Sequence, residues 1–307
     1  MAIKIIKEAN LSWLNIDAVD QEAVDHLREN YNFHHLDLED VASESTHIPK
    51  VDIYRNYLFV VLHFPQWNHA EKKIDIHEID FFIGDGYFIS IPHDKTKEMK
   101  TFFYRCMKNR RVRAEWMSGT SGYLFYQLIE ALFHETRPIL SNIGKHISII
   151  ENEIFTGDQD INVIKELAVH RRNILSFRRI IDPERHLLSN LSHIRKPFLD
   201  ESLSLYFDDV RDYLDKLWAI VETYKETTDG LHITVESLIN QRTNRLISAL
   251  TVISVALLPL NLLSGIYGMN IDELPFAHNP AAVWAMLAGL ATLIILIIVL
   301  YRRKRWL

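Results

Sequence analysis

The chain has 307 residues, a net charge of −6 and a mean hydropathy near zero. The acidic balance disfavours nucleic acid as a partner, and the single cysteine, Cys106, excludes an intrachain disulfide and indicates a reducing compartment. The hydropathy averages two unlike parts, because residues 246–301 contain no lysine or arginine while the first 245 residues carry nearly all of the charge. The first 17 residues lack an apolar run long enough for a signal peptide, so we expect no export of the N-terminal part.

The first 120 residues predict a mixture of strands and helices. Residues 51–64 and 74–83 are rich in β-branched and aromatic side chains, and residues 81–91 predict a hairpin around Asp85-Gly86. Residues 20–32 and 95–106 read as helices.

From Tyr123 onward the pattern is helical, with breaks expected near Gly157-Asp158, Pro183 and Pro197. Between Pro197 and Pro259 there is no proline and one glycine, Gly230. A single helix running from there into the apolar region would have about 65 residues and be about 100 Å long. Such a helix is suited to be a stalk that transmits movement.

The stalk region is acidic. Residues 200–229 hold nine acids and three bases, and Asp208, Asp212 and Asp215 share a helix face with Asp209 beside them. A solvated acidic face is the usual explanation, and a site for a hard cation, which prefers oxygen ligands, is the alternative.

Two uncharged or nearly uncharged segments, residues 246–271 and 281–301, are each long enough to cross a bilayer as a helix. Arginines precede the first segment, a basic cluster follows the second, and the loop between them has no basic residue. The positive-inside rule then places both termini in the cytoplasm and the loop outside. Pro259 lies inside the first segment, where it is expected to bend the helix.

A stripe of mostly small and polar residues, with two aliphatic ones, runs along the first predicted span. They lie at alternating spacings of three and four, which places them on one helix face: Asn244, Ile247, Thr251, Ser254, Leu258, Asn261, Gly265 and Gly268. A tight helix–helix seam is one interpretation. A pore lining shared by several copies is the other, and it requires an oligomer because two helices cannot enclose a channel.

Catalytic and nucleotide-binding motifs are absent from the sequence, which has no GxxxxGK[ST], HExxH, GxSxG or CxxC. The fifteen histidines show no metal-ligand spacing, so we expect ordinary surface or core roles for them. We therefore expect no enzyme activity and no organic cofactor.

The segment "LPLNLLSGIYGMN" (258–270), a short loop, a second span and the basic end "RRKRWL" (302–307) resemble the CorA family of magnesium transporters. Gly268-Met269-Asn270 matches that family's signature at the outer pore mouth. The resemblance extends upstream through "TNRLISALTVIS" (243–254), "YFDDVRD" (206–212), "HIPKVDIYRNYLFVVL" (47–62) and "HHLDLEDV" (34–41), so it covers most of the chain.

The resemblance implies a funnel-shaped homopentamer in the cell (inner) membrane. Its segments would be a cytoplasmic α/β/α domain at 1–155, a helical stalk at 156–245, a pore-lining span at 246–270, an outer loop at 271–280, a second span at 281–301 and a basic cytoplasmic tail at 302–307. The implied pore-facing residues are Asn244, Ile247, Leu250, Leu258, Asn261, Gly268 and Asn270. The resemblance selects Leu250 where the stripe selects Thr251. Regulatory Mg²⁺ sites between subunits would use Asp40, with Glu39 beside it, and Asp209 of a neighbour.

The neutral mouth suits a strongly hydrated cation. Mg²⁺ loses its water shell reluctantly, so a ring of Asn270 amides with Gly268 carbonyls below would accept hydrogen bonds from those waters. A ring of carboxylates would hold the ion too tightly for conduction. Asp272 and Glu273 would attract cations to the loop. Two departures from the family concern selectivity and entry: Asn261 stands where threonine is frequent, and "LPFA" (274–277) lacks the usual acid after proline.

The leading hypothesis is therefore potential-driven influx of Mg²⁺, with Co²⁺ and Ni²⁺ as further candidate ions, gated by cytoplasmic Mg²⁺. Transport of Zn²⁺, as in a sister branch of the superfamily that varies the signature methionine, is the first alternative; Met269 favours magnesium. A membrane-anchored sensor or scaffold that conducts nothing is the second, but it would not need the polar stripe or Asn270.

Overall fold

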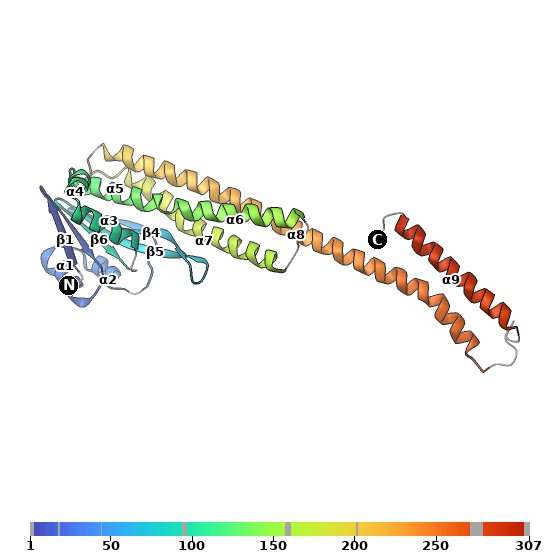
Figure 1. Ribbon diagram of the computed structural model, residues 1–307. Coiled ribbons are helices and arrows are strands. Elements are labelled where there is room, and N and C mark those ends of the chain that lie inside the picture. Colours follow the sequence, from blue (N-terminus) through green and yellow to red (C-terminus); the bar gives the residue numbers. More distant parts are fainter. Residues whose placement is uncertain are drawn as a thin grey trace. The chain divides into compact units, whose positions relative to one another are not determined.

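A computed structural model describes residues 3–17, 19–43, 45–93, 97–156, 161–200, 202–270 and 279–303. The chain forms two compact units, Met1–Leu231 and His232–Leu307. In Figure 1 the sheet and the helices around it belong to the first unit, and the C-terminal helical part of the chain belongs to the second.

The first unit is built on a six-stranded sheet. Its strands are β1 (Ile3–Glu8), β2 (Leu11–Ile16), β3 (Lys50–Ile53), β4 (Tyr57–Asn68), β5 (Lys73–Gly84) and β6 (Tyr87–Pro92), in the order β1-β2-β6-β5-β4-β3. Only the β2–β6 pair is parallel among these strands. The predicted hairpin at 81–91 is confirmed: Gly84 pairs with Tyr87, and Gly86 has a φ of +76°, which glycine adopts without strain.

Helices cover both faces of the sheet. On one face α1 (Gln21–Asn30) and α2 (His35–Ala42) pack with Phe59, Val61 and Phe82 in a buried core. The other face is covered by α3 (Lys97–Lys108), α5 (Ser121–His134) and α7 (Ile161–Leu191), with α4 (Arg110–Trp116) beside α3. Aromatic contacts join α3 and α5 to the strands: Trp13–Phe103, Phe81–Phe125 and Phe64–Phe133. The predicted helices at 20–32 and 95–106 and the α/β fold class are confirmed.

The expected break at Pro183 is wrong, because Pro183 lies inside α7, which continues to Leu191. A proline in a helix interior costs about 3 kcal/mol, and burial on both sides of it outweighs that cost: Ile180, Ile181, Leu187 and Leu188 are buried. Glu184, the next residue, is fully buried and accepts a hydrogen bond from the backbone N–H of His63 at 2.6 Å. The break near Pro197 is confirmed. The one expected near Gly157-Asp158, after α6 (Arg137–Thr156), lies outside the described residues.

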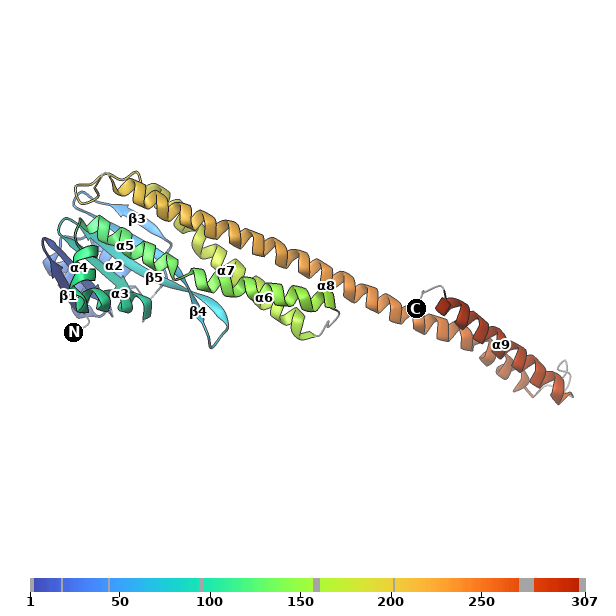
Figure 2. The same ribbon diagram turned by 45° about the horizontal axis from the view of Figure 1, so that its top comes forward.

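The long helix α8 (Leu203–Tyr267) has 65 residues, as the sequence predicts, and it contains Pro259 without ending there. Within the first unit it runs beside α7 in both views (Figures 1 and 2). Three ion pairs at seven-residue spacing join the two helices: Arg171–Asp229 at 2.8 Å, Arg178–Glu222 at 2.6 Å and Arg185–Asp215 at 2.6 Å. The guanidinium groups of Arg178 and Arg185 also lie over the ring of Trp218. The second unit contains the rest of α8 and α9 (Pro280–Arg303).

Gly122 in α5 allows the turn before α8 to approach closely. A Cβ at this position would lie 2.6 Å from Leu199 Cδ2 and 2.8 Å from the carbonyl oxygen of Phe198. We therefore expect Gly122→Ala to lower the free energy of unfolding by about 1–3 kcal/mol through overpacking, measured as a lower Tm of the purified protein.

Gly230→Ala is the matched control, because nothing lies within 4 Å of a Cβ built at this position of α8. Alanine should raise stability there by up to about 1 kcal/mol, since glycine is the poorer helix former. Equal effects of the two substitutions would contradict the close approach at Gly122.

Candidate functional site

The second unit exposes a large apolar surface. Leu246, Ile247, Leu250, Leu258 and Leu262 of α8 are each more than half exposed. A soluble monomer rarely leaves a contiguous apolar patch of this extent in water. Among the described residues, α8 is the one helix long and apolar enough to cross a membrane, and Pro280–Leu296 of α9 is a shorter apolar helix.

The polar stripe and the half-buried positions lie on opposite faces of α8. The half-buried positions of this part of α8 are Ser248, Ala249, Val252, Ala256, Pro259, Leu260, Leu263 and Tyr267. They gather on one side of the helix, and α9 returns alongside this part of α8 in Figures 1 and 2. At about 100° per residue the stripe is displaced from them by about half a turn, and all eight of its members are exposed. The stripe is therefore free to face other copies of the chain.

The C-terminal end of α8 is shaped by Gly268. Its N–H donates to the carbonyl oxygen of Ser264 at 2.9 Å, and a Cβ at this position would lie 2.9 Å from that oxygen. The space beside Ser264 is thus too small for a side chain. Met269 and Asn270 follow the helix and are exposed. Asp272 and Glu273, predicted to attract cations, lie outside the described residues.

Asp40, a predicted regulatory ligand, is already paired within its own chain. Lys50 Nζ donates to Asp40 Oδ2 at 2.7 Å and to Asp52 Oδ2 at 2.6 Å, and His47 Nε2 lies 3.6 Å from Asp40 Oδ1. Burial opposes the charge on Lys50, but the hydrogen bonds that its ammonium donates to Asp40 and Asp52 outweigh this effect and raise its pKa. Glu39 is exposed. A divalent cation at Asp40 must therefore compete with a permanently charged lysine.

Asp209 differs from the acids around it. Asp208 and Asp212 accept from Arg211 at 2.9 and 3.1 Å, and Asp215 accepts from Arg185. Asp209 is exposed, and no ion pair holds it within the described part of the chain. Burial, with Glu130 and Asp209 nearby, raises the pKa of the Tyr126 hydroxyl. The Asp209 carboxylate is thus available to a ligand, while no hydrogen bond or ion pair in the described residues joins it to Asp40.

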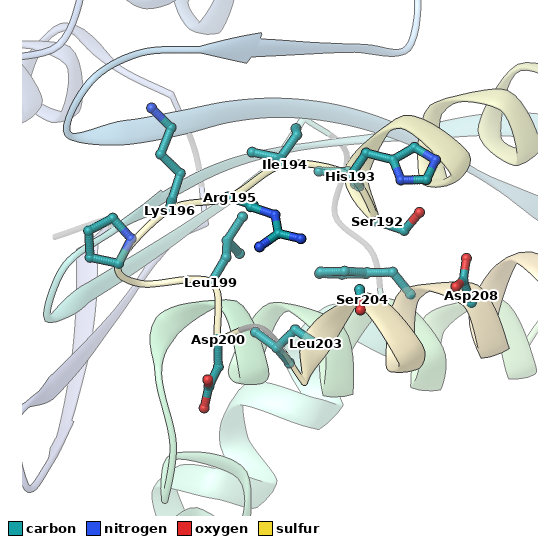
Figure 3. Close-up of a pocket in the computed structure, with 13 residues that line it drawn as sticks. Ser192, His193, Ile194, Arg195, Lys196, Leu199, Asp200, Leu203, Ser204 and Asp208 are labelled. Atoms are coloured by element: carbon teal, nitrogen blue, oxygen red, sulfur yellow. The ribbon is translucent and has the colours of Figure 1, made fainter.

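A pocket of about 710 Å³ lies where the turn after α7 leads into α8. Figure 3 shows Ser192 and His193 on one wall, Ser204 and Asp208 on the other and Arg195 between them. Its lining holds both basic and acidic side chains, and Asp208 is bound by Arg211. This mixed lining lacks the cluster of free oxygen donors that a hard cation needs.

Comparison with known proteins agrees with this arrangement. The sequence profile of a family described as "CorA-like Mg2+ transporter protein" matches residues 8–304. A Cobalt/magnesium transport protein CorA of Thermotoga maritima is 25% identical over 96% of this chain and 83% of its own length. A Zinc transport protein ZntB of Yersinia enterocolitica is 20% identical over 96% of this chain and 85% of its own length.

The fold also matches a solved structure. The complete structure of the CorA magnesium transporter from Methanocaldococcus jannaschii superimposes with a TM-score of 0.83 at 20% identity, covering 98% of this chain and 93% of that one. The α/β unit, the long helix and the C-terminal helix therefore form a known architecture.

Competition at Asp40 is testable. We expect Lys50→Gln to lower about tenfold the Mg²⁺ concentration at which half of the Mg²⁺-induced rise in Tm is reached. The reason is that the Asp40 carboxylate loses its bound ammonium. Lys50→Arg keeps the charge and should behave like the native protein. An unchanged Mg²⁺ requirement in Lys50→Gln would show that Asp40 is not a ligand.

Proposed function

Because the chain belongs to the CorA-like Mg²⁺ transporter family, we propose that it is a channel-like transporter for Mg²⁺ influx. The family consists of divalent cation transporters, so the activity of this chain is transport and not catalysis, and its members are membrane proteins. Which ion passes, what drives it and what closes the pathway are our proposals. Co²⁺ and Ni²⁺ are further candidate ions.

The observation that carries the proposal is the exposed polar stripe opposite the half-buried face of α8. In hydrocarbon, polar side chains need partners or water, and a single copy provides neither on that face. Several copies, five by the resemblance, would turn the stripes of α8 toward a common axis while α9 faces lipid. Asn244 and Asn261 would offer oxygens to the ion, and Ile247, Leu250 and Leu258 would form the apolar constriction. The oligomer would sit in the cell membrane with two spans per copy and both termini in the cytoplasm.

The mouth of this pore would be neutral. Asn270 amide oxygens and Gly268 carbonyls accept hydrogen bonds from the waters around Mg²⁺ without removing them. Gly268 is needed there because the tight backbone contact with Ser264 leaves no room for a Cβ. Asp272 and Glu273 would concentrate cations outside the mouth.

The membrane potential is sufficient as the driving force. One elementary charge gains about 2.3 kcal/mol per 100 mV, so Mg²⁺ gains about 4.6 kcal/mol, more than a thousandfold in equilibrium ratio. Influx thus needs no ATP.

Closure would come from cytoplasmic Mg²⁺ held between Asp40 of one copy, with Glu39 beside it, and Asp209 of the next. Asp209 is exposed and without an ion pair in the described residues, as such a bridge requires. Lys50 would compete for Asp40 and set the Mg²⁺ concentration at which the bridge forms. When Mg²⁺ is scarce, the bridge is lost and the constriction opens.

Zinc transport is the second candidate, favoured by the similarity to a ZntB protein. The donors at the mouth count against it, because Asn270 and Gly268 offer oxygen only, whereas zinc prefers nitrogen and sulfur ligands.

Asn270→Ala tests the mouth directly. In proteoliposomes with an inside-negative potential, we expect Mg²⁺ influx through the native protein and a loss of about tenfold or more in the variant, because the amide ring is gone. Asn270→Asp should bind Mg²⁺ more tightly and conduct more slowly. Mg²⁺ influx unchanged by Asn270→Ala would refute the proposed role of Asn270 at the pore mouth. If the native protein carried Zn²⁺ but no Mg²⁺, zinc transport would be the favoured function.

The gate is tested by the double variant Asp40→Ala/Asp209→Ala. We expect high internal Mg²⁺ to close the native protein and to leave the variant open, because the bridging carboxylates are missing. Asp212→Ala is the control, since Arg211 already neutralises Asp212. Normal closure of the double variant would exclude this pair as the sensor.

A further inference from the structure

Five ionisable side chains crowd around the middle of β5, in the first unit and beside Asp40. They are Glu78 and Asp80 of β5, His63 of β4, His93 just after β6, and His47 in the segment before β3. Glu78 and Asp80 point to the same sheet face as Phe82, toward α1 and α2, because side chains alternate along a strand. The cluster thus lies at the edge of a hydrophobic core.

Glu78, Asp80 and His93 bring three ligand atoms within 4.8 Å of one another. His93 Nε2 lies 2.7 Å from Asp80 Oδ2 and 3.8 Å from Glu78 Oε1. Two ligands of a tetrahedral Zn²⁺, each bonded at about 2.05 Å, are separated by about 3.3 Å. The two distances lie on either side of that value, so small side-chain movements would accommodate the ion.

Other residues hold these ligands in place. Glu78 Oε2 accepts from the backbone N–H of His47 at 2.8 Å and lies 3.3 Å from His63 Nε2, while Glu78 Oε1 lies 3.1 Å from His47 Nδ1. The backbone N–H of His93 donates to the carbonyl oxygen of Glu78 at 3.1 Å. Partners of this kind orient metal ligands in proteins.

Asp80 carries the second, independent observation. It is fully buried, and its Oδ1 atom has no hydrogen-bond partner. Burying a carboxylate is costly unless it is paired or coordinates a cation, and here a second buried carboxylate, Glu78, lies two residues away. His93 alone is shared between both acids. A divalent cation would supply the missing charge.

We propose that Glu78, Asp80 and His93 form a binding site for a divalent transition-metal ion of the Zn²⁺ or Co²⁺ class, with a water completing its coordination. A donor set of one imidazole and two carboxylates favours such ions over Mg²⁺, which prefers oxygen alone. The ion replaces the proton between His93 and Asp80. Access is from the side of His47 and His93, whose side chains are 20% and 19% exposed.

The site is connected to Asp40. His47 lies between the two, with Nδ1 3.1 Å from Glu78 Oε1 and Nε2 3.6 Å from Asp40 Oδ1. An ion on Glu78 adds positive charge near Asp40 and so weakens Mg²⁺ binding there. This coupling, unlike the site itself, rests on the proposed function.

Co²⁺ absorption tests the site without any transport. Metal-free full-length protein in detergent is titrated with Co²⁺, and we expect one ion per chain with the strong visible bands of four- or five-coordinate Co²⁺. Zn²⁺ should displace it and excess Mg²⁺ should not. Asp80→Asn and His93→Gln should each weaken Co²⁺ binding at least tenfold, and His69→Gln, at an exposed position in the β4–β5 turn, should leave it unchanged.

If the native protein gave only the weak visible bands of octahedral Co²⁺, the site would be overturned. Bands of the same strength in Asp80→Asn and His93→Gln as in the native protein would overturn it as well. If Asp80→Asn does not fold, His93→Gln decides alone, because its side chain is partly exposed. The coupling is tested separately in proteoliposomes: internal Zn²⁺ should raise the Mg²⁺ concentration that closes the native protein severalfold, but not in His93→Gln. The same shift in both would refute the coupling and leave the Co²⁺ result standing.

Discussion

The structure depends on one constraint: a membrane-length helical segment carries mostly asparagine, serine, threonine and glycine along one face, with Ile247 and Leu258 among them, and mostly aliphatic side chains elsewhere. In hydrocarbon the polar face needs partners. A single copy does not provide them, because the half-buried positions lie on the opposite face of α8 and the polar face stays exposed. The hydroxyl of Thr251 is satisfied within the helix by the carbonyl of Ile247 at 2.8 Å, but the amides of Asn244 and Asn261 extend further out. The need to cover this face links the helix to assembly, and assembly to a pathway for ions.

The N-terminal unit pairs several of its acidic side chains with basic ones. Asp215, Glu222 and Asp229 of α8 are neutralised by arginines of α7 at matching seven-residue spacing, which fixes the register of the two antiparallel helices. Asp40 is neutralised by Lys50. Asp209 and the buried Asp80 lack comparable ion partners in the described residues, apart from the contact of Asp80 with His93. Asp209 and Asp80 are two of the carboxylates to which we assign cations.

The sequence predicts the elements well because their signals are local: Gly86 in the hairpin, the proline-free run of α8 and the small and polar stripe. It misjudges Pro183, since the burial of Ile181 and Leu188 that holds α7 together depends on distant contacts. It treats the histidines as scattered, because His63, Glu78 and His93 meet only through strand pairing. The Glu-x-Asp spacing in β5, which puts two acids on one buried face, was the available signal. The pairing of Asp40 with Lys50 was equally hidden, because the two residues are separated by the segment that contains His47.

The most direct measurement of the central claim asks which face of α8 meets the ion. In a Cys106→Ser background, Ser254→Cys places a thiol on the polar stripe and Ala256→Cys places one on the half-buried face beside α9. A small cationic thiol reagent is applied to proteoliposomes during Mg²⁺ influx. The account predicts that the reagent blocks influx through the Ser254→Cys variant and leaves the Ala256→Cys variant active. Block of the second variant alone, or of neither, would contradict a pore lined by the stripe.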